Sequence, residues 1–238
     1  MSMNPFTTPP RRMTYSLRAL AWLLRYPDAG LRGLAPALVV ALRDEAALDA
    51  ARLAELDALA TRLASGDAIA TEAEYVELFD RGRRTSLHLF EHVHGDSRDR
   101  GQAMVDLTHT YERAGLVLAP GELPDYLPVV LEFASTQPPK VARGFLGEIA
   151  HILNAIHSAL ARQRSPYATV LAAAIELAGE RVHAVELPPE ETLDAAWAEP
   201  PAFDGCSTRG QSKPGQPTPI HFVRKPAQQA ASQPGAQA

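Results

Sequence analysis

The sequence predicts an all-α protein: a single bundle-like domain of many helices, followed by a disordered Pro/Gly-rich C-terminal tail. Apolar residues recur with helical spacing through most of the 238 residues, which is the pattern of amphipathic helices. Alternating strand patterns are nearly absent, and only residues 181–186 and 220–223 are candidates for extended segments. Helices that pack on helices around one core are the expected architecture of such a chain.

Three helices are predicted in the first part of the chain, each with apolar residues at the i, i+3, i+4 and i+7 positions of one face. The faces are Leu17, Leu20, Ala21 and Leu24; Leu34, Leu38, Ala41 and Leu42; and Leu53, Leu56, Ala60 and Leu63. Pro27 ends the first helix because proline cannot continue a helical hydrogen-bond ladder. Gly66 follows the third helix as a typical C-terminal signal.

Two further helices are expected between residues 71 and 115. Thr71 and Glu74 have the spacing of a capping box, which predicts a helix that begins there and continues through Phe79. The next helix is capped by Ser97 and stopped by Gly115. Its inward face is Met104, Val105, Thr108 and Tyr111.

The segment 121–128, GELPDYLP, is expected to bend sharply and then enter a helix through the apolar run 129–131. Proline is acceptable in the first helical turn, where backbone N–H groups have no internal partner. Asp125 would lie near the start of that helix, where the helix dipole stabilises a negative charge.

The last two predicted helices lie between residues 141 and 179. One long helix has the face Val141, Phe145, Ile149, Ile152, Leu153, Ile156 and Leu160. Ser165 and Pro166 are an N-cap and first-turn signal for a final helix, which Gly179 ends.

The chain divides into three predicted regions: a flexible N-terminus (1–13), a helical domain (14–198) and a disordered tail (199–238). The tail contains seven prolines and four glycines without a period, a composition typical of disorder. It has four basic and two acidic residues, so the net charge of −5 leaves −7 on residues 1–198. An acidic body argues against general nucleic-acid binding and is compatible with a basic or apolar peptide partner.

Targeting and disulfide signals are missing. The one cysteine, Cys206 in the tail, excludes an intrachain disulfide and a Cys-rich zinc site. The first 13 residues have no apolar core of a signal peptide, and no run approaches the roughly 18 apolar residues of a membrane span. We therefore expect a cytoplasmic protein without a transmembrane segment.

The densest polar run is residues 87–96, LHLFEHVHGD. His88 and His92 are four apart, so on a helix they would share a face and could ligate a metal with His94 or a neighbouring acid. The order differs from H-E-x-x-H because Glu91 directly precedes the second histidine. A polar helix end explains the same run, since histidine is favoured near helix C-termini.

Enzyme signatures are absent from the sequence. It contains no G-x-G-x-x-G after a strand, no G-x-x-x-x-G-K-[ST] and no G-x-S-x-G. Cys206 lies in the predicted tail, where no rigid scaffold would position a nucleophile. We therefore expect a protein that is not an enzyme, with no catalytic residues, no resident metal and no cofactor.

Two segments carry a family resemblance. Residues 74–80, EYVELFD, are followed by RRTSL at 83–87 and GDSRDRG at 95–101, and residues 122–133 read ELPDYLPVVLEF. In order and spacing these segments resemble the respiratory nitrate reductase assembly chaperones of the NarJ type, whose second motif is E-L-P-D-[HY]-L-x-x-x-L-E-F. The resemblance covers residues 16–177 and does not include the tail.

The resemblance implies an all-helical chaperone that binds the N-terminal peptide of the nitrate reductase catalytic subunit. Such chaperones hold that subunit in the cytoplasm until the molybdenum cofactor is inserted, so the insertion machinery is a second candidate partner. The residues expected to bind the peptide are Tyr75, Phe79, Asp80, Arg83, Leu87, Glu122, Leu123, Asp125, Tyr126 and Leu127. Among them, Asp80, Glu122 and Asp125 are expected to form an acidic rim around an apolar groove.

Two other functions remain open from the residues alone. One is a helical metal-dependent hydrolase that uses His88, His92 and an acid. The other is an adaptor domain with an unrelated partner.

Overall fold

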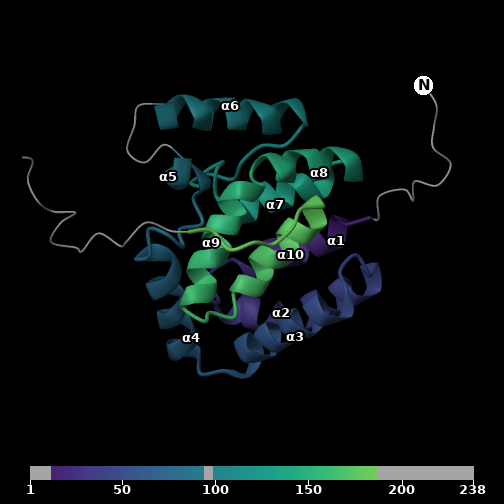
Figure 1. Cartoon of the computed structure of the whole chain (residues 1–238), viewed down its shortest axis with the longest axis vertical. Coiled ribbons are helices and arrows are strands. Elements are labelled where there is room, and N and C mark those ends of the chain that lie inside the picture. Colours follow the sequence, from purple (N-terminus) through teal and green to yellow (C-terminus); the bar gives the residue numbers. More distant parts are fainter. Residues whose placement is uncertain (1–11, 94–98, 187–238) are drawn as a thin grey trace, which may run out of the picture. The chain divides into compact units, whose positions relative to one another are not determined.

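A computed structural model describes residues 12–93 and 99–186, and Figure 1 shows that this part of the chain is built from helices. The all-α prediction is therefore confirmed. The elements are α1 (Thr14–Leu23), α2 (Ala29–Glu45), α3 (Ala50–Ser65), α4 (Ala68–Tyr75), the π-helix η1 (Val76–Asp80), α5 (Leu89–Val93), α6 (Asp99–Arg113), α7 (Leu127–Thr136), α8 (Pro139–Glu148), α9 (Ala150–Arg162) and α10 (Ala168–Ala178).

Three aspartates begin consecutive helices. The carboxylates of Asp28, Asp49 and Asp67 each accept a hydrogen bond of 2.8 Å from the N–H three residues later, at the starts of α2, α3 and α4. The predicted capping box at Thr71 is therefore wrong. Thr71 lies inside α4, where its hydroxyl donates to the Asp67 carbonyl oxygen at 2.7 Å.

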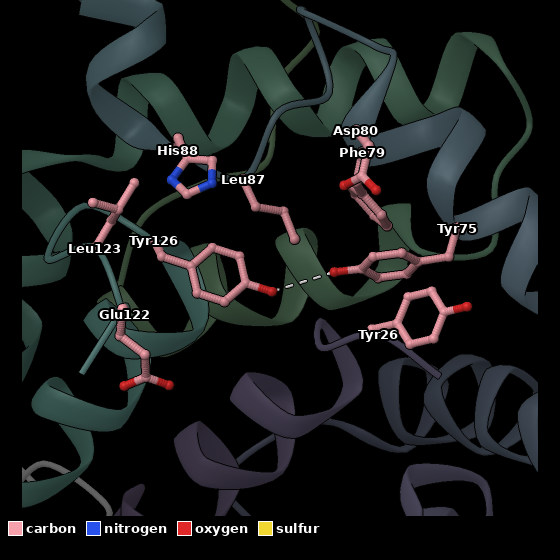
Figure 2. Close-up of a pocket in the computed structure, with 10 residues that line it drawn as sticks. Tyr26, Tyr75, Phe79, Asp80, Leu87, His88, Glu122, Leu123 and Tyr126 are labelled. Carbon is pink, nitrogen blue, oxygen red and sulfur yellow. Dashed lines mark hydrogen bonds between the residues drawn. The ribbon is translucent and has the colours of Figure 1, made fainter. Parts of the chain in front are cut away.

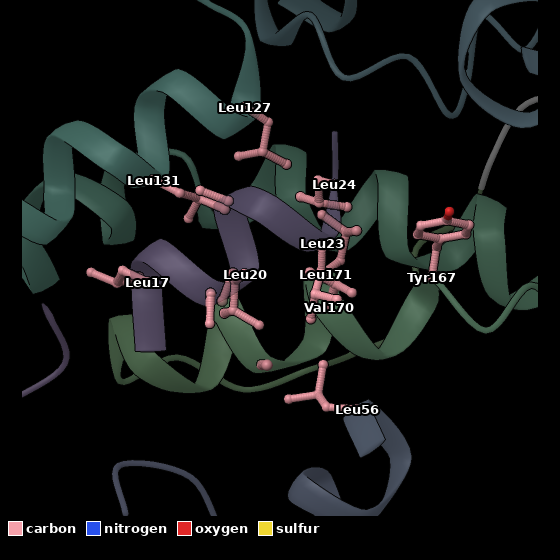
Figure 3. Close-up of a cluster of buried hydrophobic side chains, with 14 of the residues drawn as sticks. Leu17, Leu20, Leu23, Leu24, Leu56, Leu127, Leu131, Tyr167, Val170 and Leu171 are labelled. Carbon is pink, nitrogen blue, oxygen red and sulfur yellow. The ribbon is translucent and has the colours of Figure 1, made fainter. Parts of the chain in front are cut away.

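The main core lies where α1 and α7 meet α10. Figure 3 shows Leu17, Leu20, Leu23 and Leu24 close to leucines of α7 and to Val170 and Leu171 of α10. Nearly every residue of α10 is buried, so this helix is apolar on all sides rather than on one stripe. The core holds in place the ends of α1 and α7, which border the candidate site.

A smaller cluster connects α6 to the bundle. Tyr111 is the one buried residue of α6, and its ring lies 4.6 Å from that of Phe133 on α7. The hydroxyl of Tyr111 donates to the carbonyl oxygen of Pro124 at 2.8 Å. This bond anchors α6 to the loop that carries the second motif.

The predicted long helix over residues 141–160 is instead two helices, α8 and α9. The chain leaves helical geometry at Ile149 (φ −99°, ψ 2°), two residues after Gly147, a residue of low helix propensity. Beyond α10, residues 181–186 form no strand. Their backbone is held along α9, where the N–H of His183 donates to Asn154 Oδ1 at 2.9 Å.

Several predictions fall on residues outside the described ranges: the disordered tail, the Ser97 cap and most of the N-terminal segment 1–13. Met13, the last residue of that segment, is buried in the core. Among the helices of the described residues, none combines the length and hydrophobicity that crossing a membrane requires.

Candidate functional site

The two sequence motifs meet through a short antiparallel contact. The N–H of Leu89 donates to the Asp125 carbonyl oxygen at 3.0 Å, and the N–H of Leu127 donates to the Leu87 carbonyl oxygen at 2.8 Å. His88 and Tyr126 are thereby paired in an isolated β-bridge. Segments far apart in the sequence thus form one wall of a pocket.

This pocket has a volume of about 440 Å³ and is drawn in Figure 2; we call it the aromatic groove. Its lining residues come from the turn after α1, from α4 and η1, and from the two paired segments. They are Tyr26, Tyr75, Phe79, Asp80, Leu87, His88, Gly121, Glu122, Leu123 and Tyr126. The volume lies in the usual range of binding sites, about 300–1,000 Å³.

A π-helical turn shapes one side of the aromatic groove. In η1 the N–H of Arg81 donates to the carbonyl oxygen of Val76, five residues earlier, at 3.1 Å. The chain then turns tightly at Gly82, where a Cβ atom would collide with the Leu78 carbonyl oxygen. The hydroxyl of Thr85 donates to that same oxygen. This turn holds η1, which carries Phe79 and Asp80, beside the groove.

The bottom of the aromatic groove is a hydrogen-bonded aromatic cluster. The Tyr75 hydroxyl donates to the Leu24 carbonyl oxygen at 2.8 Å, so Tyr126 is the donor in the 3.3 Å contact between the two tyrosine hydroxyls. The rings of Tyr75 and Phe79 lie 4.8 Å apart, and Phe79 meets Tyr167 edge-on at 5.1 Å. Burial raises the pKa of Tyr75 and of Tyr126, so both hydroxyls are neutral hydrogen-bonding groups.

Asp125 is buried next to His88 and does not line the aromatic groove. Its side chain has no exposed surface. The carboxylate accepts a hydrogen bond from the N–H of Phe90 at 3.1 Å, in the first turn of α5, and lies 3.5 Å from His88 Nδ1. The hydrogen bond with Asp125 raises the pKa of His88 above its usual value, although burial opposes this shift. Asp125 therefore joins the two paired segments of this wall and is not a rim charge, which corrects the prediction.

The charges at the mouth of the aromatic groove come from Asp80 and Glu122. Asp80 is exposed, whereas Glu122 Oε1 lies 3.3 Å from Nη2 of Arg25. A side depression of about 240 Å³ continues from the groove and shares Phe79, Asp80 and His88 with it. The exposed Arg83 lines this depression.

Most of the predicted peptide-binding residues come together in this region. Those that line the aromatic groove are Tyr75, Phe79, Asp80, Leu87, Glu122, Leu123 and Tyr126. Three do not: Arg83 lines the side depression, Asp125 is buried against His88, and Leu127 is fully buried in the main core, facing α1. Leu127 therefore supports the groove from behind and does not line it.

Two lining side chains were not predicted. Tyr26 comes from the turn after α1, and its ring meets that of Tyr75 edge-on at 5.6 Å. A large aromatic residue directly before Pro27 was the only sequence signal for it. His88 was considered only as a metal ligand, yet its ring lies 5.3 Å from that of Tyr126.

The geometry does not assemble the predicted histidine pair on one helix face. His88 precedes α5, and its Nδ1 faces Asp125, whereas His92 Nε2 contacts the Ser86 carbonyl oxygen at 2.9 Å. Within residues 12–93 and 99–186, no three or more His, Cys, Asp or Glu side chains gather where they could hold a metal ion. His94, the other histidine of this run, lies outside the described residues.

The comparisons with known proteins agree on one family. The family model for the nitrate reductase delta subunit matches residues 44–173. The nitrate reductase molybdenum cofactor assembly chaperone NarJ of Escherichia coli (strain K12) is 39% identical over 187 residues, 74% of this chain and 79% of its own. The probable chaperone of the same name from Bacillus subtilis (strain 168) is 35% identical over 177 residues, 73% of this chain and 94% of its own.

A solved structure shares the fold. A putative redox enzyme maturation protein from Archaeoglobus fulgidus superposes with a TM-score of 0.50 at 20% identity, over 75% of this chain and 100% of its own. The two sequence relatives described above are named as chaperones and not as enzymes, in agreement with the expectation from the sequence. Because the family model spans more than half of the chain and the relatives match most of it, the chain belongs to the nitrate reductase delta subunit family.

Proposed function

We propose that this chain is a nitrate reductase assembly chaperone that binds the N-terminal peptide of the catalytic subunit in the aromatic groove. The names of its relatives support the chaperone role and the partner. The observation that carries the site is the combination of clustered aromatic side chains with exposed carboxylate charge in a single groove.

The shape of the site favours a peptide. The aromatic groove and the side depression share three residues, so the two cavities adjoin each other. An amphipathic helix laid into an apolar groove is a common mode of peptide recognition. Leu123, with 44% of its surface exposed at the groove, is placed to contact the apolar face of such a helix.

The charges favour a peptide with basic side chains. Asp80 and Glu122 lie at the groove, and the region 1–198 carries a net charge of −7. Attraction between an acidic surface and a basic peptide raises the association rate more than the final affinity. In this proposal, the bound chaperone holds the catalytic subunit in the cytoplasm until the molybdenum cofactor is inserted, and the insertion machinery is a second partner.

Calorimetry tests this function directly. A synthetic peptide of the first residues of the catalytic subunit is titrated into the full chain at several temperatures. Burial of apolar surface with helix formation gives saturable binding with a negative heat-capacity change. Ordering the peptide costs about 2–5 kcal/mol of the gross interaction energy, so we expect moderate affinity.

A matched pair of variants locates the site. Leu123→Ser should weaken peptide binding, whereas Val141→Ser, at a valine of α8 with 52% exposure outside the groove, should leave it unchanged. Circular dichroism checks that each variant is folded. The absence of binding heat at every temperature and salt concentration would overturn the proposal and favour an adaptor with an unrelated partner.

A further inference from the structure

We infer that Arg25 is a built-in competitor for a basic side chain of the bound peptide, and so sets the specificity of the aromatic groove. The inference rests on the peptide-binding function proposed above. In the free protein, the guanidinium of Arg25 pairs with Glu122, a carboxylate that a basic peptide side chain would use.

Arg25 is held at the edge of the aromatic groove by three groups. Its Nη2 lies 3.3 Å from Glu122 Oε1 and 3.3 Å from Glu132 Oε2. Its guanidinium carbon lies 5.1 Å from the centre of the Trp22 ring, within the range of a cation–π contact. The side chains of Arg25 and Glu122 are 30% and 33% exposed, so solvent and a ligand can both reach the pair.

Glu122 faces two cavities, and Arg25 reaches it from only one of them. Glu122 lines the aromatic groove and also a second groove of about 470 Å³ between α1, α7 and the loop after α6. Arg25 and Glu132 line this second groove and not the aromatic groove. Figure 2 shows Glu122 at the border of the aromatic groove, with its carboxylate pointing away from Tyr126. The ion pair therefore neutralises groove charge from outside the groove.

An exchange of partners follows from this geometry. A basic peptide side chain in the aromatic groove can take over Glu122, and Arg25 then keeps Glu132 and Trp22 as partners. The peptide gains one ion pair while the protein loses one, so the net gain at Glu122 is small. Without Arg25, the same peptide would gain the pair with no loss. The affinity of a peptide without a basic side chain at this position would not depend on Arg25.

The test is to remove the competitor and measure peptide affinity. Partly exposed ion pairs contribute little, so Arg25→Gln should lower the Kd for the basic peptide by about two- to fivefold. The same peptide with its Lys and Arg replaced by Gln should bind wild type and variant equally. Arg25→Lys keeps the positive charge and should bind as wild type does. Arg25→Met keeps an aliphatic stem over Trp22 and repeats the test if the Gln variant is poorly folded.

The matched control is Arg18→Gln. Arg18 also lines the second groove, but its Nε donates to Ser135 Oγ at 3.2 Å instead of pairing with Glu122. Both Gln variants change the net charge equally, so equal tightening by Arg18→Gln would show a long-range charge effect and overturn the inference. If Arg25→Gln binds the basic peptide as wild type does or more weakly, while wild type binds normally, this inference is overturned and the proposed function is not. No peptide binding by wild type would overturn the proposed function and this inference together.

Discussion

Replacing Asp125 with asparagine tests whether this residue joins the two paired segments beside the aromatic groove or acts as a charge on its rim. The carboxylate has no exposed surface and accepts the N–H of Phe90 at 3.1 Å. A buried hydrogen bond to a charged group is worth about 1.5–3 kcal/mol, and loss of a helix cap costs about 0.5–2 kcal/mol. Asparagine keeps one acceptor oxygen, so we expect a loss of about 1–3 kcal/mol.

For a folded body of this size, each kcal/mol shifts Tm by about 2–4 °C, which predicts a fall of about 2–12 °C in a circular dichroism melt. The control is Asp44→Asn, the same substitution at an exposed position of α2, which should change stability by no more than about 0.5 kcal/mol. Because Asp125 is not on the rim, the folded variant should also keep the salt dependence of peptide binding.

The pH dependence of the same variant has a definite sign. The hydrogen bond with Asp125 raises the pKa of His88 in the folded state above the unfolded value of about 6.5. The stabilisation from this pair is therefore fully present below about pH 6.5 and is lost as the pH rises through the folded pKa. The difference in Tm between wild type and Asp125→Asn should be larger at pH 6 than at pH 8.5. Equal melting temperatures at pH 6, or a salt-dependent loss of binding without a stability change, would refute the buried role.

Two further substitutions test the supports of the aromatic groove. Gly82→Ala should destabilise the protein by about 1–3 kcal/mol in urea unfolding because its Cβ would collide with the Leu78 carbonyl oxygen. The control is Gly33→Ala, in open space inside α2, which should stabilise the protein by about 0.5–1 kcal/mol. An equal effect of both substitutions would contradict the argument from the close approach at Gly82. Tyr75→Phe removes the buried hydrogen bond to the Leu24 carbonyl oxygen and should cost about 1–2 kcal/mol, so an unchanged urea midpoint would show that this bond contributes nothing.

The helices were predictable because their core faces repeat with helical spacing. Leu17 and Leu20 fall on one face of α1, and they and Leu24, which directly follows the helix, are all buried. Periodicity was a poor guide to where helices begin and end. The apolar pattern continues through Ile149, although the chain turns there between α8 and α9. Apolar spacing alone does not report a change of helix axis.

Only the part of the candidate site that lies within the two sequence motifs was predictable from the sequence. Tyr75 and Tyr126 belong to the two segments that carry the family resemblance, and both line the aromatic groove. Tyr26 comes from a third segment, which only the packing of α1 against the others brings to the groove. The burial of Asp125 depends on the bridge between residues 88 and 126, a long-range contact that spacing along the chain does not reveal.

The most direct test of the central claim is site-specific photo-crosslinking in nitrate-grown cells. A photoreactive amino acid is placed at Leu123, at the aromatic groove, and in a second strain at Val141, which is exposed outside it. Mass spectrometry then maps the crosslinked partner. We predict that the Leu123 position crosslinks to the first residues of the nitrate reductase catalytic subunit, and that the Val141 position does not. Crosslinks to that peptide from Val141 alone, or none from Leu123 in folded protein, would contradict the account.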